Sequence, residues 1–393
     1  MTRPVEHIRA YHLELTRIRR DIHAHPELAF DERRTASVVA AELEKYGVQV
    51  HRGLAKTGVV GVIRGKGAGD QSVGLRADMD CLPITETNDF EHRSRHEGRM
   101  HACGHDGHTT MLLGAARYLA ATRNFAGTAV LIFQPAEEGG GGGEVMVREG
   151  LFDRFPVDQI YALHNWPGLP PGQIAVRAGP VMAATDEVTI TVRGRGGHGA
   201  MPHLAVDPVV ASAQLISALQ TIASRNVSPV DAVVVSICSM QTSQTGAFNV
   251  IPESVRLIGT VRTFQAATRD LAERRVKEIA AKVAEALGAS ATVEYVRGYP
   301  ATVNSAREAQ HAARVGERVF GAGNVITEFP PTMGGEDFSY MLQARPGAYV
   351  FLGQGGAQGG CFLHNPNYDF NDEVIPLGAG YLAALVEEAL PVR

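Results

Sequence analysis

The sequence predicts an α/β protein in which helices flank a mostly parallel sheet, with a ferredoxin-like α+β domain inserted into it. Short apolar strands alternate with helices over the first half of the chain, and a strict alternation of apolar and polar residues begins near residue 184. The length of 393 residues also favours two domains over one. We expect the main domain to span residues 1–184 and 298–393 and the insert to span residues 185–297.

The charge pattern argues against two classes of partner. The formal net charge is −5 without a basic or acidic block, which is not typical of a protein that binds nucleic acid. The first twenty residues are charged throughout and hold no long apolar run, so we expect neither a signal peptide nor a membrane span. Cys81, Cys103, Cys238 and Cys361 lack the spacing of a disulfide framework, which favours a reducing cytoplasm.

The main domain is predicted from helix and strand patterns that follow one another along the chain. Apolar residues at intervals of three and four predict a helix over residues 5–24, with His23 and His25 at its surface-exposed end. The apolar run at 128–134 has the character of a buried central strand. The other expected elements are helices at 35–46, 109–121 and 377–390 and strands at 58–63, 72–76, 158–163 and 348–353.

The insert is predicted from a strand–helix–strand–strand–helix–strand order, which is that of a ferredoxin-like sandwich. In residues 186–193, Val188, Ile190 and Val192 alternate with polar side chains, as in a half-exposed antiparallel strand. Asp207 and Pro208 are suited to the N-cap and first position of a helix. The expected elements are strands at 186–193, 232–239, 254–262 and 292–296 and helices at 207–223 and 268–287.

Residues 100–108 combine three histidines, a thiol and a carboxylate. Cys103 and His105 can approach one metal ion from a turn, because Gly104 between them lets the backbone bend sharply. A polar loop with an incidental thiol is the alternative. A zinc site needs four ligands, or three and a water, so the metal hypothesis requires further ligands elsewhere in the chain.

Further ligands are available where predicted strands end. Asp78, Glu137, Glu138 and His164 each lie just past such an end, and His364 follows the last strand. Parallel sheets bind small molecules and ions beyond the carboxyl ends of their strands, so these side chains are expected to share one site. Together they supply five candidate metal ligands: Cys103, His105, Glu138, His164 and His364.

Five ligands are more than one zinc ion needs and suit two ions that share a bridging water. Thiolate and imidazole favour zinc, whereas carboxylate and imidazole also accept manganese, cobalt or nickel. The roles of Arg262, His203 and Glu336 stay open, because each residue type suits a substrate contact as well as an ordinary salt bridge or loop position.

Nine segments in order along essentially the whole chain carry a family resemblance. They lie at 20–27, 75–80, 101–108, 134–140, 164–165, 196–200, 249–252, 333–338 and 364–366. Through them the sequence resembles the amidohydrolase branch of the M20 metallopeptidases. This branch includes hippurate hydrolases, N-acyl-amino-acid amidohydrolases and plant auxin-conjugate hydrolases.

The resemblance implies a zinc-peptidase-like catalytic domain, an inserted lid or dimerisation domain, two divalent metal ions and a homodimer or higher homo-oligomer. It also implies roles for individual residues. The five candidate ligands named above would be the metal ligands, Glu137 the general base and Asp78 a carboxylate behind the ligands. His198 would reach the active site of a neighbouring subunit, and Asn249 would bind substrate.

The residues suit the hydrolysis of an amide. A metal polarises the carbonyl and lowers the pKa of a bound water to about 7. Glu137 can take the proton of that water and pass it to the leaving nitrogen, and His198 can donate to the oxyanion. Adjacent glutamates in extended backbone point to opposite sides, so only one is expected to ligate, unless Pro135 or the glycines after Glu138 bend the chain.

The expected function is the cleavage of an N-acyl amino acid to a carboxylate and a free amino acid. An N-acetyl-diaminopimelate deacetylase, a metallo-carboxypeptidase or a dipeptidase is the alternative among enzymes. A binding protein for acyl amino acids is the alternative outside enzymes, although the intact Glu137 argues against it.

Overall fold

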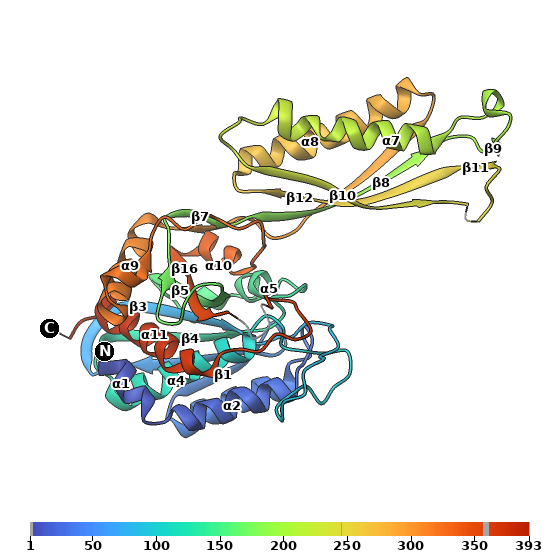
Figure 1. Ribbon diagram of the computed structural model, residues 1–393. Coiled ribbons are helices and arrows are strands. Elements are labelled where there is room, and N and C mark those ends of the chain that lie inside the picture. Colours follow the sequence, from blue (N-terminus) through green and yellow to red (C-terminus); the bar gives the residue numbers. More distant parts are fainter. Residues whose placement is uncertain (1–2, 245, 357–360, 393) are drawn as a thin grey trace. The chain divides into compact units, whose positions relative to one another are not determined.

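The computed structural model describes residues 3–244, 246–356 and 361–392. The chain forms two compact units (Figure 1). Unit 1 comprises Met1–Val181, Val303–Pro330 and Asp337–Arg393, and unit 2 comprises Met182–Thr302 and Pro331–Glu336. Unit 2 therefore extends beyond residues 185–297 at both ends and includes a short segment from later in the chain.

Unit 1 is built on one large mixed sheet. Its strands are β1 (Gln49–Leu54), β2 (Gly58–Arg64), β3 (Gly67–Asp78), β4 (Ala126–Gln134), β5 (Gln159–Pro167), β6 (Ile174–Ala175), β15 (Val325–Ile326) and β16 (Gly347–Gly355). Their order is β1-β2-β4-β3-β5-β16-β6-β15. The central pairs β4–β3, β3–β5 and β5–β16 are parallel, whereas β1 and β2 extend the sheet antiparallel. The predicted fold class is confirmed, and the parallel part forms the middle of the sheet.

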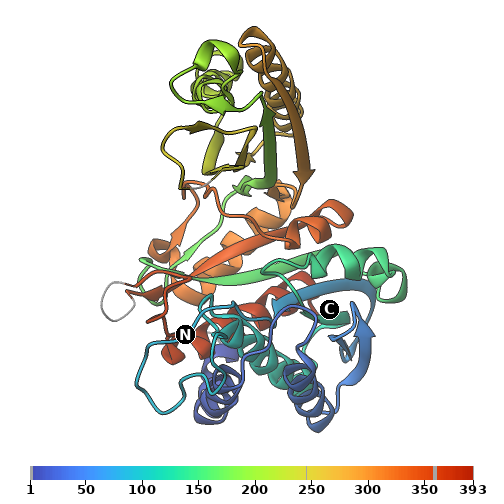
Figure 2. The ribbon, with the colours of Figure 1, turned by 90° about the vertical axis from the view of Figure 1, so that its right-hand side faces the viewer.

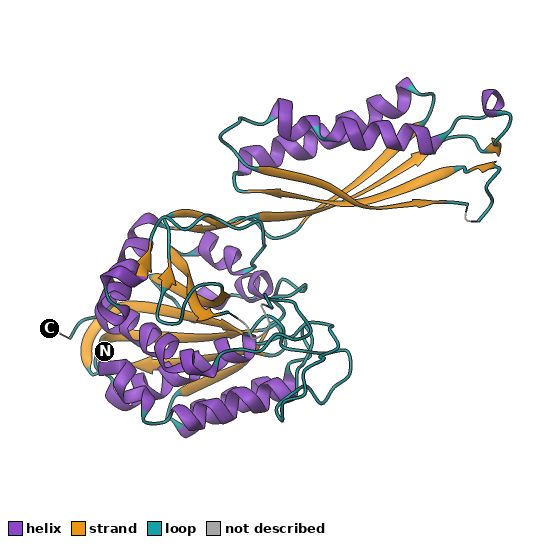
Figure 3. Ribbon diagram, viewed as in Figure 1, coloured by secondary structure: helices purple, strands orange, loops and turns teal. Residues whose placement is uncertain are grey.

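Helices cover both faces of this sheet (Figure 3). They are α1 (Arg3–Arg9), α2 (His12–Ala24), α3 (Arg33–Lys45), α4 (His105–Thr122), α5 (Gly142–Arg148), α6 (Leu151–Arg154), α9 (Ala306–Phe320), α10 (Phe338–Ala344) and α11 (Ile375–Ala389). On one face α11 lies close to α4 and β16 at Gly378. An added Cβ at this position would collide with Met111 of α4 and lie 3.1 Å from Leu352 of β16. On the other face Phe338 of α10 packs on Tyr349 of β16, with ring centroids 5.9 Å apart.

Strand β4 has the burial expected of a central strand. Every residue from Ala129 to Gln134 is buried, because neighbouring strands pair with both edges and helices cover both faces. Since β4 ends at Gln134, the Pro135–Glu138 segment lies at the carboxyl end of the sheet's parallel part.

The structure differs from the expected elements of unit 1 in a few places. The helix expected over residues 5–24 is two helices, separated between Arg9 and His12, and β1 had no counterpart in the prediction. Asp78 is the last residue of β3 and His164 lies within β5, so neither follows its strand. Both strands continue past their apolar runs because backbone pairing continues, with Asp78 opposite Gln134 and His164 opposite Phe351.

Unit 2 is a four-stranded antiparallel sheet covered on one face by two helices (Figures 1 and 2). Its main elements in chain order are β8 (Ala184–Arg193), α7 (Pro208–Leu219), β10 (Val233–Thr242), β12 (Ser254–Thr263), α8 (Ala266–Ala286) and β13 (Ser290–Arg297). The strand order β10-β12-β8-β13 is that of the predicted ferredoxin-like sandwich. Val188, Ile190 and Val192 belong to its buried core, as their alternation predicts.

Local sequence explains where α7 begins. Asp207 is its N-cap and accepts a hydrogen bond from the Val209 backbone N–H at 2.8 Å, and Pro208 occupies the first helical position. Shorter elements complete the two units: β7 (Gly179–Met182), β9 (Gly197–His198), β11 (Val250–Ile251), β14 (Thr302–Asn304), the 3₁₀ turns Pro202–Leu204, Ala322–Asn324 and Asp372–Val374, and a π-helical turn at Ile222–Asn226. In the part of the chain that the structure describes, none of the helices is long and apolar enough to cross a bilayer.

Candidate metal centre

The turn that carries Cys103 and His105 depends on glycine. Gly104 is the N-cap of α4 and has φ +95°, in the left-handed region that side chains disfavour. A Cβ at this position would collide with Asn165 Oδ1 and lie 2.8 Å from Tyr368 Oη. The tight approach turns the chain into α4 so that Cys103 lies just before the helix and His105 is its first residue.

The structure brings the five candidate ligands together at the carboxyl end of the parallel strands in unit 1. Cys103 Sγ lies 3.4 Å from His164 Nε2, His105 Nε2 lies 3.8 Å from Glu138 Oε1, and His364 Nε2 lies 3.3 Å from the same oxygen. Their ligand atoms fall into overlapping groups, in each of which all atoms lie within 4.8 Å of one another: Cys103, His105 and His164; Cys103, Glu138 and His364; and His105, Glu137 and Glu138.

Glu137 and Glu138 both face the cluster. The expectation that neighbouring glutamates point apart is wrong here, because the backbone after β4 is a turn and not an extended strand. Ala136 has φ +57°, and its N–H donates to Glu32 Oε1 at 2.9 Å. The sequence allowed a bend at Pro135 or in the glycines as the alternative to an extended backbone, and the structure has such a bend.

Two of the candidate histidine ligands are oriented by hydrogen bonds from Nδ1. The Nδ1 of His164 donates to the Asn165 carbonyl at 2.7 Å, and the Nδ1 of His105 donates to the Asp80 carbonyl at 3.0 Å. The Nε2 lone pair of His164 is thereby directed into the cluster. Burial alone would lower the pKa of His105, but the Asp78 and Asp80 carboxylates raise it to about 10, so a metal ion would have to displace its Nε2 proton. Burial lowers the pKa of His164 well below its ordinary value, so its imidazole is neutral and able to ligate.

Two further observations fit a bound cation. In the described part of the chain, His105 Nε2 and Glu138 Oε1 are buried without a hydrogen-bond partner, which is costly unless something else binds them. Burial also raises the pKa of the Cys103 thiol well above its usual range, and the Glu138 and Glu137 carboxylates raise it further. A thiolate in this place needs a cation beside it. Sulfur, imidazole and carboxylate are the ligand types that bind zinc and related ions.

Asp78 lies directly behind the ligands. Arg76 Nη1 donates to its Oδ2 at 2.6 Å, and His108 Nδ1 donates to its Oδ1 at 2.6 Å. His105 Nε2 is 3.8 Å from the Asp78 carboxylate. Both oxygens of Asp78 are thus engaged by protein donors, an arrangement that suits a supporting carboxylate better than a direct ligand.

The sequence did not indicate the roles of several supporting residues. Asp80 accepts hydrogen bonds from His105 Nδ1 and from the Glu138 N–H, the latter at 2.9 Å, so it orients two candidate ligands at once. Gln134 Nε2 donates a hydrogen bond to the Asp337 carboxylate at 2.7 Å, and the Arg76 guanidinium donates hydrogen bonds to both Gln134 and Asp337. Polar residues at the ends of buried strands were the sequence feature that could have indicated these roles. The residues that they bond to are distant in sequence, so the sequence does not identify the pairs.

His198 and Asn249 lie side by side in unit 2. His198 is in β9, which pairs with β11, and the Gly199 N–H donates to the Asn249 carbonyl at 2.7 Å. Both side chains are exposed, and His198 Nδ1 accepts from the Ala200 N–H at 3.1 Å. The structure thus places the two predicted residues of the insert on neighbouring backbone segments.

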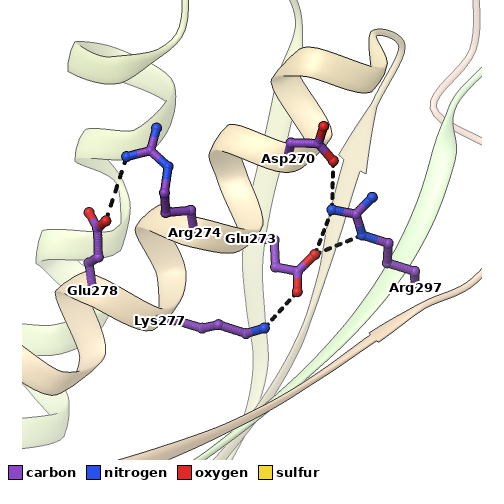
Figure 4. A pocket seen from close by; sticks show the side chains of 6 residues that line it. All are labelled: Asp270, Glu273, Arg274, Lys277, Glu278 and Arg297. Atoms are coloured by element: carbon purple, nitrogen blue, oxygen red, sulfur yellow. Dashed lines mark hydrogen bonds and ion pairs between the residues drawn. The ribbon is translucent and has the colours of Figure 1, made fainter.

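Unit 2 also carries a surface group of charged side chains (Figure 4). These are Asp270, Glu273, Arg274, Lys277 and Glu278 on α8 and Arg297 on β13. Arg297 bonds to Asp270 and Glu273 at 2.7 Å each, and Lys277 bonds to Glu273 at 2.6 Å. Such exposed pairs stabilise a fold by roughly 0–1 kcal/mol each, and we assign this group no chemical role.

Comparison with known proteins gives consistent matches over most of the chain. A model of peptidase family M20/M25/M40 matches residues 74–388. The hippurate hydrolase of Campylobacter jejuni is 41% identical over 372 residues, which are 95% of this chain and 95% of that protein. The IAA-amino acid hydrolase ILR1-like 4 of Arabidopsis thaliana is 40% identical over 381 residues, which are 95% of this chain and 85% of that protein.

A solved structure is similar throughout. The crystal structure of Bacillus subtilis YXEP protein, a dinuclear metal binding peptidase from the M20 family, superposes with a TM-score of 0.85 at 32% identity. The match covers 98% of this chain and 100% of the other. The similarity thus extends over both units.

Proposed function

The chain belongs to peptidase family M20/M25/M40, and we propose that it is a metal-dependent amidohydrolase that cleaves N-acyl amino acids to a carboxylate and a free amino acid. The observation that carries this proposal is the cluster of Cys103, His105, Glu138, His164 and His364 with the Glu137 carboxylate beside it. The names of the hippurate and IAA-amino acid hydrolases support the same substrate class.

The five clustered side chains would hold two divalent ions, with zinc or manganese as the first candidates and cobalt or nickel as alternatives. Such ions polarise an amide carbonyl and make a water molecule acidic enough to be deprotonated near neutral pH. The Glu137 carboxylate, which is 7% exposed, accepts the proton of that water and delivers it to the leaving nitrogen. Asp80 holds His105 and the Glu138 backbone in place for this step, and Asp78 accepts a hydrogen bond from His108 behind them.

Unit 2 has a supporting role in the proposal. His198 donates to the developing oxyanion in the site of a second subunit, and Asn249 beside it contacts the substrate. The working form is therefore a homodimer or a higher homo-oligomer in which unit 2 acts as a lid or dimerisation domain. A cytoplasmic location completes the proposal, supported by the free thiols of all four cysteines.

The substitution Glu137→Gln tests the proposal. It keeps the size of the side chain and removes the base, so turnover of N-acyl amino acids should fall by about 10²–10⁴-fold while the metal content stays unchanged. Glu144→Gln is the matched control, because Glu144 is an exposed glutamate on the nearby helix α5. Turnover that survives in Glu137→Gln would reject the assigned base.

A panel of substrates separates this function from its alternatives. Acetyl, benzoyl and indole-acetyl amino acids, N-acetyl-diaminopimelate and dipeptides are offered to the metal-loaded protein, and the release of free amino acid is measured. Preference for the acyl amino acids supports the proposal, and preference for one of the other substrates identifies the deacetylase or peptidase. Binding of acyl amino acids without any hydrolysis would identify a binding protein.

A further inference from the structure

A buried carboxylate contacts the turn that carries Glu137 and Glu138. Glu32 is fully buried, and its Oε1 accepts a hydrogen bond from the Ala136 backbone N–H at 2.9 Å. Ala136 immediately precedes Glu137, is itself fully buried and has φ +57°. A buried N–H without an acceptor costs free energy, so this bond helps to keep Ala136 in the left-handed region. The start of the turn therefore depends on a side chain that is 104 residues away in the sequence.

The same carboxylate binds a second non-glycine residue with positive φ. Phe30 has φ +61°, and its N–H donates to Glu32 Oε1 at 3.0 Å. The other oxygen, Oε2, accepts a hydrogen bond from the Thr57 hydroxyl at 2.6 Å. Residues with a side chain rarely adopt positive φ, and they keep it only where the surrounding structure determines it. One oxygen of Glu32 thus holds two left-handed residues, Phe30 and Ala136, and the other oxygen fixes the carboxylate in place.

Glu32 does not cap its own helix, although it occupies the capping position. It is the N-cap residue of α3, but its side chain makes no capping hydrogen bond. Glu27 accepts hydrogen bonds from the Arg34 and Thr35 N–H groups at 2.9 and 2.8 Å, and from the Thr35 hydroxyl at 2.9 Å. The two N–H groups are those that an N-cap side chain ordinarily binds. Because Glu27 already satisfies the first turn of α3, helix capping does not explain the Glu32 carboxylate.

We propose that Glu32 is a positioning residue of the hydrolase, which sets the turn at Ala136 so that Glu137 faces the reacting water and Glu138 faces the metal. This inference rests on the proposed amide hydrolysis. Glu32 is neither the base nor a ligand in it and acts through the backbone that precedes both glutamates. A displacement of about 1 Å in a catalytic group can lower the rate about 10²-fold, so a loosened turn should change both turnover and metal binding.

The proposed role requires an acceptor oxygen and not a negative charge. Burial raises the pKa of Glu32 to about 7, even though the hydrogen bond from Thr57 opposes this shift. The side chain is therefore partly neutral near pH 7, and in that form Oε1 can still accept both N–H groups. Glutamine has the same length and also offers a carbonyl oxygen, and its amide can donate to the Thr57 hydroxyl. Aspartate keeps the charge but is one methylene shorter, which withdraws its oxygens from the Ala136 N–H.

The variants Glu32→Gln, Glu32→Asp and Glu32→Met test this role by two measurements. One is kcat and KM for the N-acyl amino acid that the wild type hydrolyses fastest, and the other is zinc affinity in competition with a chelator. Glu32→Gln should keep both kcat and zinc affinity within about threefold of wild type, because the acceptor remains. Glu32→Asp and Glu32→Met should lose about 10–100-fold in each, as is typical for residues that orient metal ligands. KM should change less than kcat, because the base acts on the water and not on substrate binding.

Glu27→Met is the matched control. Glu27 and Glu32 each accept hydrogen bonds from two backbone N–H groups and one threonine hydroxyl, so either loss should lower the free energy of unfolding. Only the bonds of Glu32 extend to the turn before Glu137, so Glu27→Met should keep wild-type kcat and zinc affinity. Denaturant unfolding of the same preparations measures how much stability each variant loses.

Three results would overturn the inference. Wild-type kcat and zinc affinity in Glu32→Met would show that the turn forms without the acceptor. A loss in Glu32→Gln as large as in Glu32→Met would show that the acceptor oxygen is not what matters. A loss in Glu27→Met as large as in Glu32→Met would assign the effect to general destabilisation of this region.

Two further comparisons keep the test decisive. If Glu32→Met does not fold, Glu32→Asp and Glu32→Gln decide, because retention in the aspartate variant with loss in the glutamine variant would contradict the assigned role. If the wild type hydrolyses no N-acyl amino acid at all, the proposed function fails. The zinc affinities of the variants then still decide whether Glu32 holds the turn.

Discussion

At the scale of single residues, His23 shows how tertiary surroundings override sequence position. Its place at the end of a helix before Pro26 predicts a surface side chain, but the structure buries it completely, and this prediction is wrong. His23 Nδ1 lies 2.8 Å from Asp106 Oδ2, and Nε2 lies 3.2 Å from Glu86 Oε1. Both carboxylates come from distant parts of the chain, so the short sequence around His23 contains no sign of them.

These contacts predict how stability depends on pH. Burial alone would lower the pKa of His23, but the charge of Asp106 and the hydrogen bonds to Asp106 and Glu86 raise it from 6.5 to about 9. Because the folded state binds the proton more tightly, this contribution to stability is complete below about pH 6.5 and is lost as the pH rises through about 9. A pKa shift of this size corresponds to a contribution of His23 to the free energy of unfolding on the order of 3 kcal/mol.

The measurement is the thermal unfolding midpoint of wild type and His23→Gln between pH 6 and pH 10. The wild type should be more stable at pH 6, and the two midpoints should converge above about pH 9. His25→Gln is the control, since His25 is one-quarter exposed and its nearest charged partner is the half-exposed Asp21. A difference between wild type and His23→Gln that stays constant with pH would contradict the assigned ion pair.

At the scale of elements, the backbone conformation at Gly104, between Cys103 and α4, is tightly constrained. Gly104 combines a positive φ with close contact to Asn165 and Tyr368. The same tyrosine accepts a hydrogen bond from Asn165 Nδ2 at 2.7 Å. The geometry of Cys103 and His105 therefore depends on packing between segments that are far apart in sequence.

We expect Gly104→Ala to lower the free energy of unfolding by about 3 kcal/mol, through backbone strain and the collision of the new Cβ. Metal content should fall with it, because Cys103 and His105 flank the substituted residue. Gly53→Ala is a matched control: Gly53 has the same φ of +95°, but a Cβ there meets no atom within 4 Å. The control should cost only about 1–2 kcal/mol and leave metal content unchanged.

Denaturant unfolding and elemental analysis of the purified variants provide these values. Equal destabilisation by the two alanines would mean that the contact with Asn165 and Tyr368 contributes nothing. Full metal content in a folded Gly104→Ala protein would show that the turn is not needed to position the ligands.

At the scale of the whole molecule, the proposed reaction uses residues from two units. The candidate ligands and Glu137 belong to unit 1, whereas His198 and Asn249 belong to unit 2. Our proposal that His198 serves the site of a neighbouring subunit makes the homodimer a requirement of activity and not only a state of assembly.

Mixing of two inactive variants tests this arrangement. In a heterodimer of His198→Ala and Glu137→Gln subunits, one site regains both Glu137 and His198 if the histidine acts across the interface. Equal mixing with random exchange should then restore about a quarter of wild-type turnover. Sedimentation at micromolar concentration checks that dimers are present.

Two outcomes would contradict the arrangement across subunits. If His198 acts within its own chain, no heterodimer contains a complete site and mixing restores nothing. If the protein is a fully active monomer, the proposed role of unit 2 in dimerisation is wrong.

The amino-acid sequence by itself determined the fold class and the candidate ligands. Both follow from local patterns: apolar periodicity distinguishes the parallel sheet from the antiparallel insert, and Cys103, His105, Glu138, His164 and His364 have the side chains that bind metals. Only the tertiary structure decided how these residues are held, because the partners that hold them come from distant segments. It turned Glu137 and Glu138 to the same side, joined Asp80 to His105 and Glu138, and buried His23 between Asp106 and Glu86.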